Sequence, residues 1–204
     1  TRDQLALVEP LSIGGHAVAR AQLRPEETIL VIGAGPIGLS VTAHVKAAGV
    51  RTIVMDVSED RLRFARAQFN VAATIKAGEN VNEQLADLTN GEMPMVVFDA
   101  TGNAASMNES FNYPANGGRL ILVGLHLDFV TFRDQDFHRK ELTVLSSRNA
   151  TAADFQHTIA LLETGQIDIT PWVTHRVKDS ELIAQFPSWL DAKAGFIKAI
   201  VEWS

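Results

Sequence analysis

Three glycines at the spacing G-x-G-x-x-G are the residues of this sequence best suited to binding a phosphate-bearing ligand. They are Gly33, Gly35 and Gly38. Gly33 would permit a sharp turn, Gly35 has no Cβ to obstruct a pyrophosphate, and Gly38 would let a helix pack closely on a strand. A helix beginning after this loop offers free N–H groups and the positive end of its dipole to the phosphates. The spacing therefore indicates a dinucleotide site.

Asp56 is the second residue that points to this chemistry. It stands 18 residues beyond Gly38, directly after the apolar segment 51–55. A carboxylate after the second strand can accept hydrogen bonds from the ribose hydroxyls of NAD. We expect NAD to be preferred over NADP, because a 2′-phosphate would meet a like charge and neither Val57 nor Ser58 supplies a cation.

The elements that must position these residues alternate along the chain. Apolar runs predict strands, helical apolar repeats predict helices, and turn residues separate them. Strands are expected at 29–32, 51–55, 72–75, 95–98, 119–123 and 141–145, with helices at 37–45, 59–69, 82–88 and 103–111 between them. This alternation predicts an α/β fold of the Rossmann type, a doubly wound parallel sheet whose ligands bind at the carboxyl ends of the strands.

The two ends of the chain do not continue this pattern. A first helix is expected to begin near Pro10, because proline is favoured in a first helical turn, and Glu9 would then complement the dipole at its start. After residue 150, a capping box at Thr151 opens a helix, followed by a strand at 172–177, a helix at 180–190 and a strand at 196–203. This tail is not another unit of the same parallel sheet.

Composition excludes several classes of partner and site. The net charge of −6, without a basic cluster, argues against nucleic-acid binding. No apolar run approaches the ~18 residues that span a bilayer, and no signal peptide is visible, so a cytoplasmic protein is expected. With no cysteine, the chain can form neither a disulfide nor a thiolate zinc site, and its six histidines show no metal-ligand spacing.

Two other nucleotide-binding enzyme classes do not fit. Short-chain dehydrogenases need a tyrosine with a lysine four residues later, whereas Tyr113 is the only tyrosine and position 117 is glycine. Methyltransferases place an acid just before the first glycine, where this chain has Val31 and Ile32. Two hypotheses remain: part of another dinucleotide-dependent enzyme, or a stand-alone nucleotide-binding module without catalytic activity.

Several stretches resemble one known family in order. The sequence is similar to the zinc-dependent medium-chain dehydrogenases, in the branch of sorbitol, threonine and sugar-acid dehydrogenases. The matching residues are 7–12, 31–39, Asp56 with 61–62, 98–102, 117–125 and 173–176. By this resemblance, residues 9–148 are the NAD-binding domain, and residues 149–204 are a segment that completes a catalytic, GroES-like domain. The start at Thr1 without Met suggests a piece of a longer protein.

The resemblance also implies an activity. Members transfer a hydride from a secondary alcohol to NAD, assisted by a zinc ion whose main ligands lie in an N-terminal domain that is missing here. We therefore expect this piece alone to be inactive as an alcohol dehydrogenase. Expected substrates are small polyols, sugar acids or amino alcohols, and a homo-oligomer, dimer or tetramer, is expected through the apolar edge strand 142–145.

Residue roles follow from the same resemblance. The pyrophosphate would lie on the glycine loop, and the adenosine ribose would bind Asp56, with the adenosine end against Arg61. The nicotinamide would lie near the ends of two later strands. The catalytic zinc would lie near Glu9, which is both the catalytic and the metal candidate. The implied cofactor-binding residues are Gly33, Gly35, Pro36, Ile37, Gly38, Asp56, Arg61, Val123, Gly124, Leu125, Ser147, Arg148 and, for the pyrophosphate, Lys198.

Overall fold

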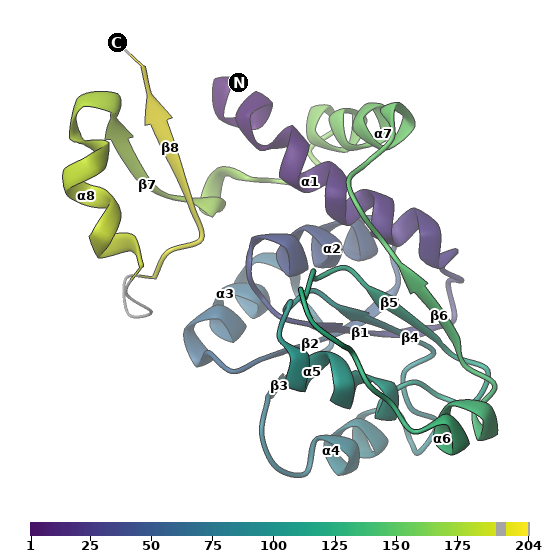
Figure 1. The fold of residues 1–204 in the computed structure, drawn as a ribbon. Coiled ribbons are helices and arrows are strands. Elements are labelled where there is room, and N and C mark those ends of the chain that lie inside the picture. The colour runs from purple at the N-terminus through teal and green to yellow at the C-terminus, as the bar shows by residue number, and fades with distance from the viewer. Residues whose placement is uncertain (191–194, 204) are drawn as a thin grey trace.

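A six-stranded parallel sheet forms the centre of the protein (Figure 1). The structure is a computed structural model that describes residues 1–190 and 195–203. The strand order is β3-β2-β1-β4-β5-β6, so the order reverses between β1 and β4. The strands are β1 (Thr28–Ile32), β2 (Arg51–Asp56), β3 (Ala73–Lys76), β4 (Val96–Asp99), β5 (Arg119–Leu122) and β6 (Thr143–Ser146). The predicted doubly wound parallel sheet is confirmed.

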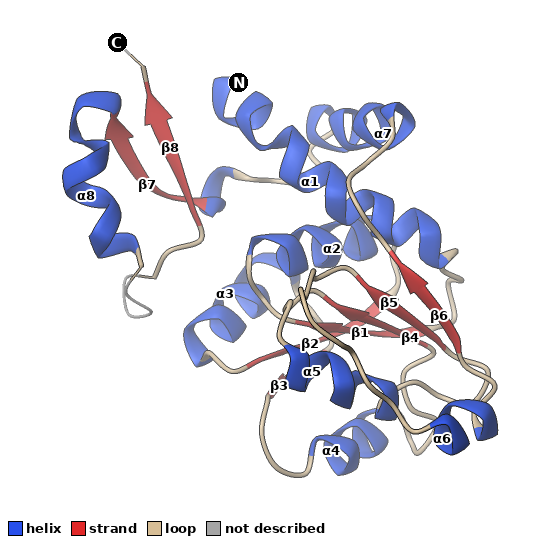
Figure 2. Ribbon diagram, in the orientation of Figure 1, coloured by secondary structure: helices blue, strands red, loops and turns tan. Residues whose placement is uncertain are grey.

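Helices cover both faces of this sheet (Figure 2). One face carries α1 (Arg2–Ala21), α2 (Pro36–Ala47), α3 (Glu59–Phe69) and α7 (Ala152–Glu163), and the other carries α4 (Val81–Leu88), α5 (Ala104–Glu109) and α6 (Asp134–Arg139). The side chains of β1 alternate between the two cores: Ile29 and Val31 pack in one, and Leu30 and Ile32 in the other. Burial on both faces explains why the strand is continuously apolar.

The register of the sheet brings three strand ends together. Ile32, the last residue of β1, pairs with Met55 on one side and with Asp99 on the other. The loops that follow β1, β2 and β4 therefore leave the sheet side by side, at the point where the strand order reverses. Ligands of such sheets bind in the crevice at this position.

The first helix differs from the sequence prediction. It begins at Arg2, where Thr1 and Gln4 form a capping box, and Pro10 lies inside it. The Thr1 hydroxyl accepts the Gln4 N–H and the Gln4 side chain accepts from the Thr1 amine, so the helix starts here without a proline. Glu9 is consequently mid-helix and exposed, and its interpretation as a partner of the helix dipole was wrong.

A second correction concerns β6 and the segment before it. The strand was expected from residue 141, but Glu141 has a φ of 50°, which no strand residue adopts, and β6 begins at Thr143. The helix α6 was not predicted. In α7 the capping box at Thr151 is confirmed, and the buried positions of the helix are Thr158, Leu161 and Leu162.

The last part of the C-terminal tail forms a small two-stranded unit outside the central sheet, as the sequence predicted, whereas α7 at the start of the tail packs against α1. After the short 3-10 helix η2 (Thr170–Trp172), β7 (Val173–Lys178) pairs in parallel with β8 (Lys198–Glu202). Between them lie η3 (Asp179–Glu181) and α8 (Leu182–Trp189). Figure 1 shows this unit beyond the N-terminal end of α1, away from the central sheet.

Candidate functional site

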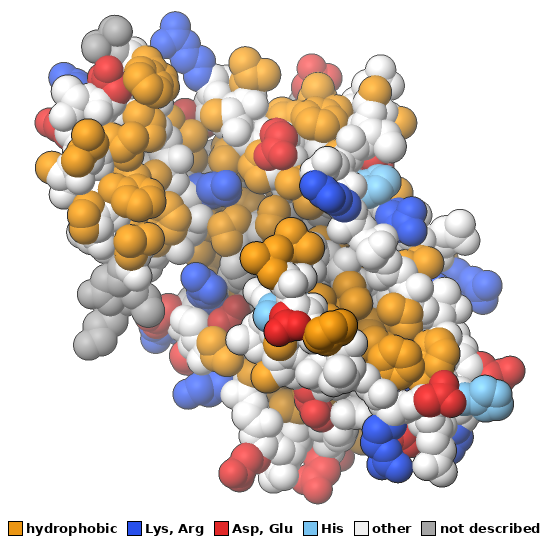
Figure 3. Space-filling view, in the orientation of Figure 1, with side chains coloured by type: hydrophobic (Ala, Val, Ile, Leu, Met, Phe, Trp, Pro, Cys, Tyr) orange, Lys and Arg blue, Asp and Glu red, His pale blue; other side chains and the backbone are white. Residues whose placement is uncertain are grey.

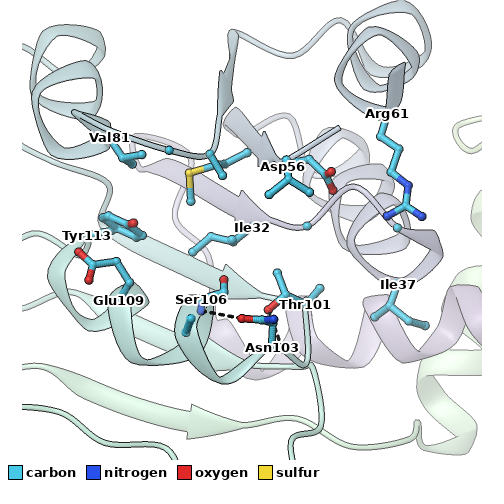
Figure 4. Close-up of a pocket in the computed structure, with 18 of the residues that line it drawn as sticks. Ile32, Ile37, Asp56, Arg61, Val81, Thr101, Asn103, Ser106, Glu109 and Tyr113 are labelled. Carbon is cyan, nitrogen blue, oxygen red and sulfur yellow. Dashed lines mark hydrogen bonds between the residues drawn. The ribbon is translucent and has the colours of Figure 1, made fainter. Parts of the chain in front are cut away.

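A cavity of about 750 Å³ opens at the carboxyl ends of β1, β2 and β4 (Figure 4). One end is formed by the glycine loop after β1, with Ile37 of α2, Asp56 of β2 and Arg61 of α3. The other end is formed by Val81 at the start of α4, Glu109 at the end of α5, and Tyr113. The cavity lies at the topological switch point of the sheet, where the sequence predicted a ligand site.

The first and third glycines of the loop are required by the protein's own packing. Gly33 has a φ of 93°, in the left-handed region that favours glycine. A Cβ on Gly38 would lie 1.7 Å from the Gly33 carbonyl oxygen, so only glycine lets α2 start this close to β1. These contacts account for two glycines of the motif without any ligand.

Gly35 is different because the protein itself does not need a glycine there. Its φ is −75°, and an added Cβ would meet only one side-chain atom within 4 Å, an Arg61 nitrogen at 3.9 Å. Gly35 is the N-cap of α2, with Pro36 next, and no side chain caps the helix. The first N–H groups of α2 are thus left for an anion in the open space above Gly35.

Asp56 connects the end of β2 to the glycine loop. It is 5% exposed, and its Oδ2 accepts the Ala34 N–H at 2.6 Å while its Oδ1 accepts the Ser58 N–H at 2.8 Å. Each carboxylate oxygen keeps a further lone pair, so the group can still accept hydroxyl groups from the cavity.

Arg61 places a cation beside the same loop. Its guanidinium has no hydrogen bond or ion pair among the described residues, and one of its nitrogens would lie 3.9 Å from a Cβ added to Gly35. It also lines a smaller cavity of about 310 Å³ that it shares with Thr174 and Phe196 of the tail. An unpaired cation next to free helix N–H groups can bind an anionic ligand.

The end of β4 is fixed by a hydrogen-bond network around Asp99. Its Oδ1 accepts the Thr101 hydroxyl at 2.6 Å, and its Oδ2 accepts the Ser106 hydroxyl at 2.7 Å. Its carbonyl oxygen accepts the N–H groups of Val123 and Gly124, and a Cβ on Gly124 would lie 2.2 Å from the Gly102 nitrogen. The loops after β4 and β5 are therefore packed directly against each other.

The structure brings only some of the predicted residues together. Gly33, Gly35, Pro36, Ile37, Asp56 and Arg61 line one cavity, and Gly38 supports its loop.

The remaining predicted residues lie outside this cavity. Leu125 is 77% exposed in the loop after β5, and Ser147, just after β6, is buried with an unpartnered hydroxyl. Arg148 is exposed, Lys198 begins β8 and is half-buried, and Glu9 is on the surface of α1. Their assigned roles stay predictions.

Sequence reasoning missed the far end of the cavity. The sequence assigns no role to residues 99–102 beyond their match to the family, and it excludes Tyr113 as a catalytic tyrosine without giving it another role. Glu109 and Tyr113 reach the cavity through the packing of α5 and the short 3-10 helix η1 (Ser110–Asn112) on the sheet. Their spacing in the sequence carries no motif that would have revealed this.

Two further properties concern metals and membranes. Among the residues that the structure describes, no group of three or more His, Asp or Glu side chains could hold a metal ion. In the same part of the chain, every helix is too short or too polar to cross a membrane.

The chain is similar to proteins of known name. A sequence model of the family described as zinc-binding dehydrogenase matches residues 36–164. The L-galactonate-5-dehydrogenase of Escherichia coli (strain K12) is 36% identical over 198 residues, which are 97% of this chain and 58% of the relative. The (R,R)-butanediol dehydrogenase of Neisseria gonorrhoeae is 32% identical over 98% of this chain and 57% of its own length.

A solved structure gives the same result for the fold. An alcohol dehydrogenase from Escherichia coli CFT073, solved with its cofactor NADH, superposes with a TM-score of 0.85 and 26% identity. The match covers 99% of this chain and 59% of that one. This chain therefore spans a little under three fifths of the length of the relatives that it matches.

Proposed function

Because this chain belongs to the zinc-binding dehydrogenase family, we propose that it is the NAD-binding portion of a dehydrogenase that oxidises a secondary alcohol. The alternative of a stand-alone nucleotide-binding module is not favoured, since the named relatives are dehydrogenases. We further propose that residues 9–148 form the coenzyme domain and that residues 149–204 belong to a second, catalytic domain. Exposed apolar side chains over α8, Ile183, Phe186 and Leu190, support this division (Figure 3).

The observation that carries the proposal is the space above Gly35. Backbone conformation and packing explain Gly33 and Gly38, but at Gly35 a side chain would enter only the open cavity. A pyrophosphate there would accept hydrogen bonds from the first N–H groups of α2 and would lie within reach of the Arg61 guanidinium. The residues present therefore fit a dinucleotide.

Asp56 would then receive the adenosine ribose. Its carboxylate is held in place by Ala34 and Ser58 and keeps lone pairs for the two ribose hydroxyls. A 2′-phosphate would have to approach this buried carboxylate, and we therefore propose NAD rather than NADP as the coenzyme.

The nicotinamide half would extend along the same edge of the sheet toward β5 and β6. We propose that the backbone of Val123, Gly124 and Leu125, together with Ser147 and Arg148, orients the nicotinamide, and that Lys198 approaches the pyrophosphate. When bound, NAD supplies the hydride acceptor, at C4 of its nicotinamide. The role of the residues in this chain is to hold that ring at a fixed position on the sheet edge.

The described residues do not supply a set of zinc ligands, so no step is assigned to a metal here. We propose that zinc is held by the part of the relatives that this chain does not span, with Glu9 approaching it from α1. Substrates of the whole protein would be small polyols, sugar acids or amino alcohols, and the names of the relatives support the first two of these classes. The cytoplasmic location and the homo-oligomeric state remain predictions.

Calorimetric titration of the 204-residue chain with NAD tests the proposal. The native chain should bind NAD, and Gly35→Ala should weaken binding at least about tenfold while leaving the protein folded, since apart from its own chain neighbours the new methyl group meets no atom closer than 3.9 Å. With zinc and a panel of polyols added, the chain should show no turnover above a blank. Native NAD affinity in Gly35→Ala would contradict the assignment of the loop.

A further inference from the structure

Most polar side chains around the 750 Å³ cavity are already hydrogen-bonded within the protein. Asp56 accepts two backbone N–H groups, and Thr101 and Ser106 donate their hydroxyls to Asp99. Two lining side chains have no hydrogen bond to any described residue: the guanidinium of Arg61 and the hydroxyl of Tyr113. Figure 4 shows them at opposite ends of the cavity. The cation at the Arg61 end suits phosphate groups, whereas the hydroxyl at the Tyr113 end suits an uncharged polar part of the ligand.

Tyr113 is held rigidly by its surroundings. It is only 5% exposed, and its ring packs in the core beneath β4 and β5 with Phe111 and Leu120. Burial, with the nearby carboxylates of Glu109 and Asp99, raises the pKa of Tyr113 to about 12. The phenol thus keeps its proton under ordinary conditions and can donate a hydrogen bond. The ring is buried, but the hydroxyl is not among the buried polar atoms of the described residues, and it borders the open cavity, where a ligand can accept its hydrogen bond.

Glu109 lies next to Tyr113 and offers the opposite hydrogen-bonding character. Its Oε1 accepts the Asn112 amide at 3.0 Å, and its carboxylate lines the same end of the cavity. An ionised carboxylate only accepts hydrogen bonds. The donor hydroxyl of Tyr113 and the acceptor carboxylate of Glu109 therefore form a mixed pair at one wall.

The space between the two ends suits a flat ring. Its lining is small and apolar on both sides, formed by Ala77, Gly78 and Val81 from the β3–α4 side and by Ala105 from α5. Such walls exclude water and leave room for an aromatic ring, while the polar pair stands at the edge.

We propose that Glu109 and Tyr113 recognise the Watson–Crick edge of the adenine base of the dinucleotide. The Glu109 carboxylate accepts a hydrogen bond from the 6-amino group, and the Tyr113 hydroxyl donates one to N1. This inference rests on the proposed function, because it takes the ribose to be anchored at Asp56. Hypoxanthine reverses the pattern, with a keto oxygen at position 6 and an N–H at N1, so that Glu109 would face another acceptor.

The test compares NAD with nicotinamide hypoxanthine dinucleotide, which differs only at this edge. In calorimetric titrations of the 204-residue chain, NAD should bind at least about tenfold more tightly. Glu109→Gln should reduce or reverse this preference, because the new amide can donate to the keto oxygen. Glu83→Gln, an exposed carboxylate of α4 outside the cavity, is the control and should keep the native preference.

Tyr113→Phe keeps the buried ring and removes only the hydroxyl, so it should weaken NAD binding without loss of the fold. Equal native affinities for the two dinucleotides would overturn the inference while leaving NAD binding itself intact. An unchanged preference in Glu109→Gln would also overturn it, and this variant decides the matter if Tyr113→Phe fails to fold. If the native chain binds neither dinucleotide, both the inference and the proposed function are wrong.

Discussion

The Asp56 carboxylate and the backbone of Ala34 are joined by a hydrogen bond of 2.6 Å, in which the Ala34 N–H donates to Oδ2. This bond ties the end of β2 to the glycine loop after β1. Asp56 therefore has two tasks: it holds the loop in shape, and it presents its remaining lone pairs to the cavity. Its replacement should affect both the loop and coenzyme choice.

Coenzyme preference provides the first prediction. Asp56→Ser should weaken NAD binding by about ten- to a hundredfold, because hydrogen bonds to a charged group contribute about 1.5 to 3 kcal/mol. Asp56→Ser combined with Val57→Arg should shift preference toward NADP, since a cation then faces the 2′-phosphate. Titration of both coenzymes measures this, and equal native affinities for NAD and NADP would refute the role of Asp56.

Removal of the Arg61 charge is the second prediction. Arg61→Gln should weaken NAD binding by about tenfold or more and should reduce its salt dependence, because the free guanidinium is the cation nearest the glycine loop on α3. Arg63→Gln is a matched control on the same helix, where the native side chain pairs with Asp60 outside the cavity. If both substitutions weakened NAD binding equally, the net charge of the protein, and not the position of Arg61 beside the glycine loop, would account for the effect.

The near end of the site could be predicted from the sequence because its cues are local. The glycine spacing, the position of Asp56 after the second strand and the capping box at Thr151 each act over a few residues, and all three features are observed. The start of α1 was missed because proline at a first turn is a weaker cue than the capping box of Thr1.

The far end of the site could not be predicted because it depends on tertiary packing. Tyr113 and Glu109 follow β4, yet they share a cavity with Val81, which precedes β4 by more than a dozen residues. Only the placement of α4 and α5 on one face of the sheet brings them together. Periodicity predicts that such helices pack on the sheet, but it does not predict which side chains meet.

A buried histidine provides the third prediction. His44 of α2 bonds the Ser40 carbonyl through Nδ1 and contacts the Thr158 hydroxyl of α7 through Nε2. Burial lowers the pKa of His44 below its ordinary value of 6.5, and the nearby His157 lowers it further. The Ser40 carbonyl and Asp154 act in the opposite direction but do not outweigh burial. The folded state therefore binds fewer protons than the unfolded state. The contribution of neutral His44 to the free energy of unfolding is therefore complete above about pH 6.5. It is lost as the pH falls toward the lowered pKa of the folded state.

The free energy of unfolding, measured by urea titration between pH 7 and 5, tests this directly. The slope from this one group is at most about 1.4 kcal/mol per pH unit. His44→Gln should reduce the pH dependence, whereas His138→Gln, at an exposed position on α6, should not. The same slope in the native chain and in His44→Gln would disprove the assignment.

Self-association through the edge of the sheet is the fourth prediction. β6 is the last strand in the sheet order and, among the residues that the structure describes, pairs with β5 alone, so its outer backbone groups are available to a second copy. Thr143 and Ser147 donate their N–H groups toward β5, which directs the Val144 N–H outward. Val144→Pro should therefore lower the mass measured by light scattering. A native chain that stays monomeric at high concentration would contradict the prediction.

A crystal structure of the 204-residue chain with NAD would test the central claim most directly. We predict that the pyrophosphate lies above Gly35 on the first N–H groups of α2 and that both adenosine ribose hydroxyls bind the Asp56 carboxylate. A dinucleotide bound elsewhere on the chain, with the space above Gly35 empty, would contradict the account.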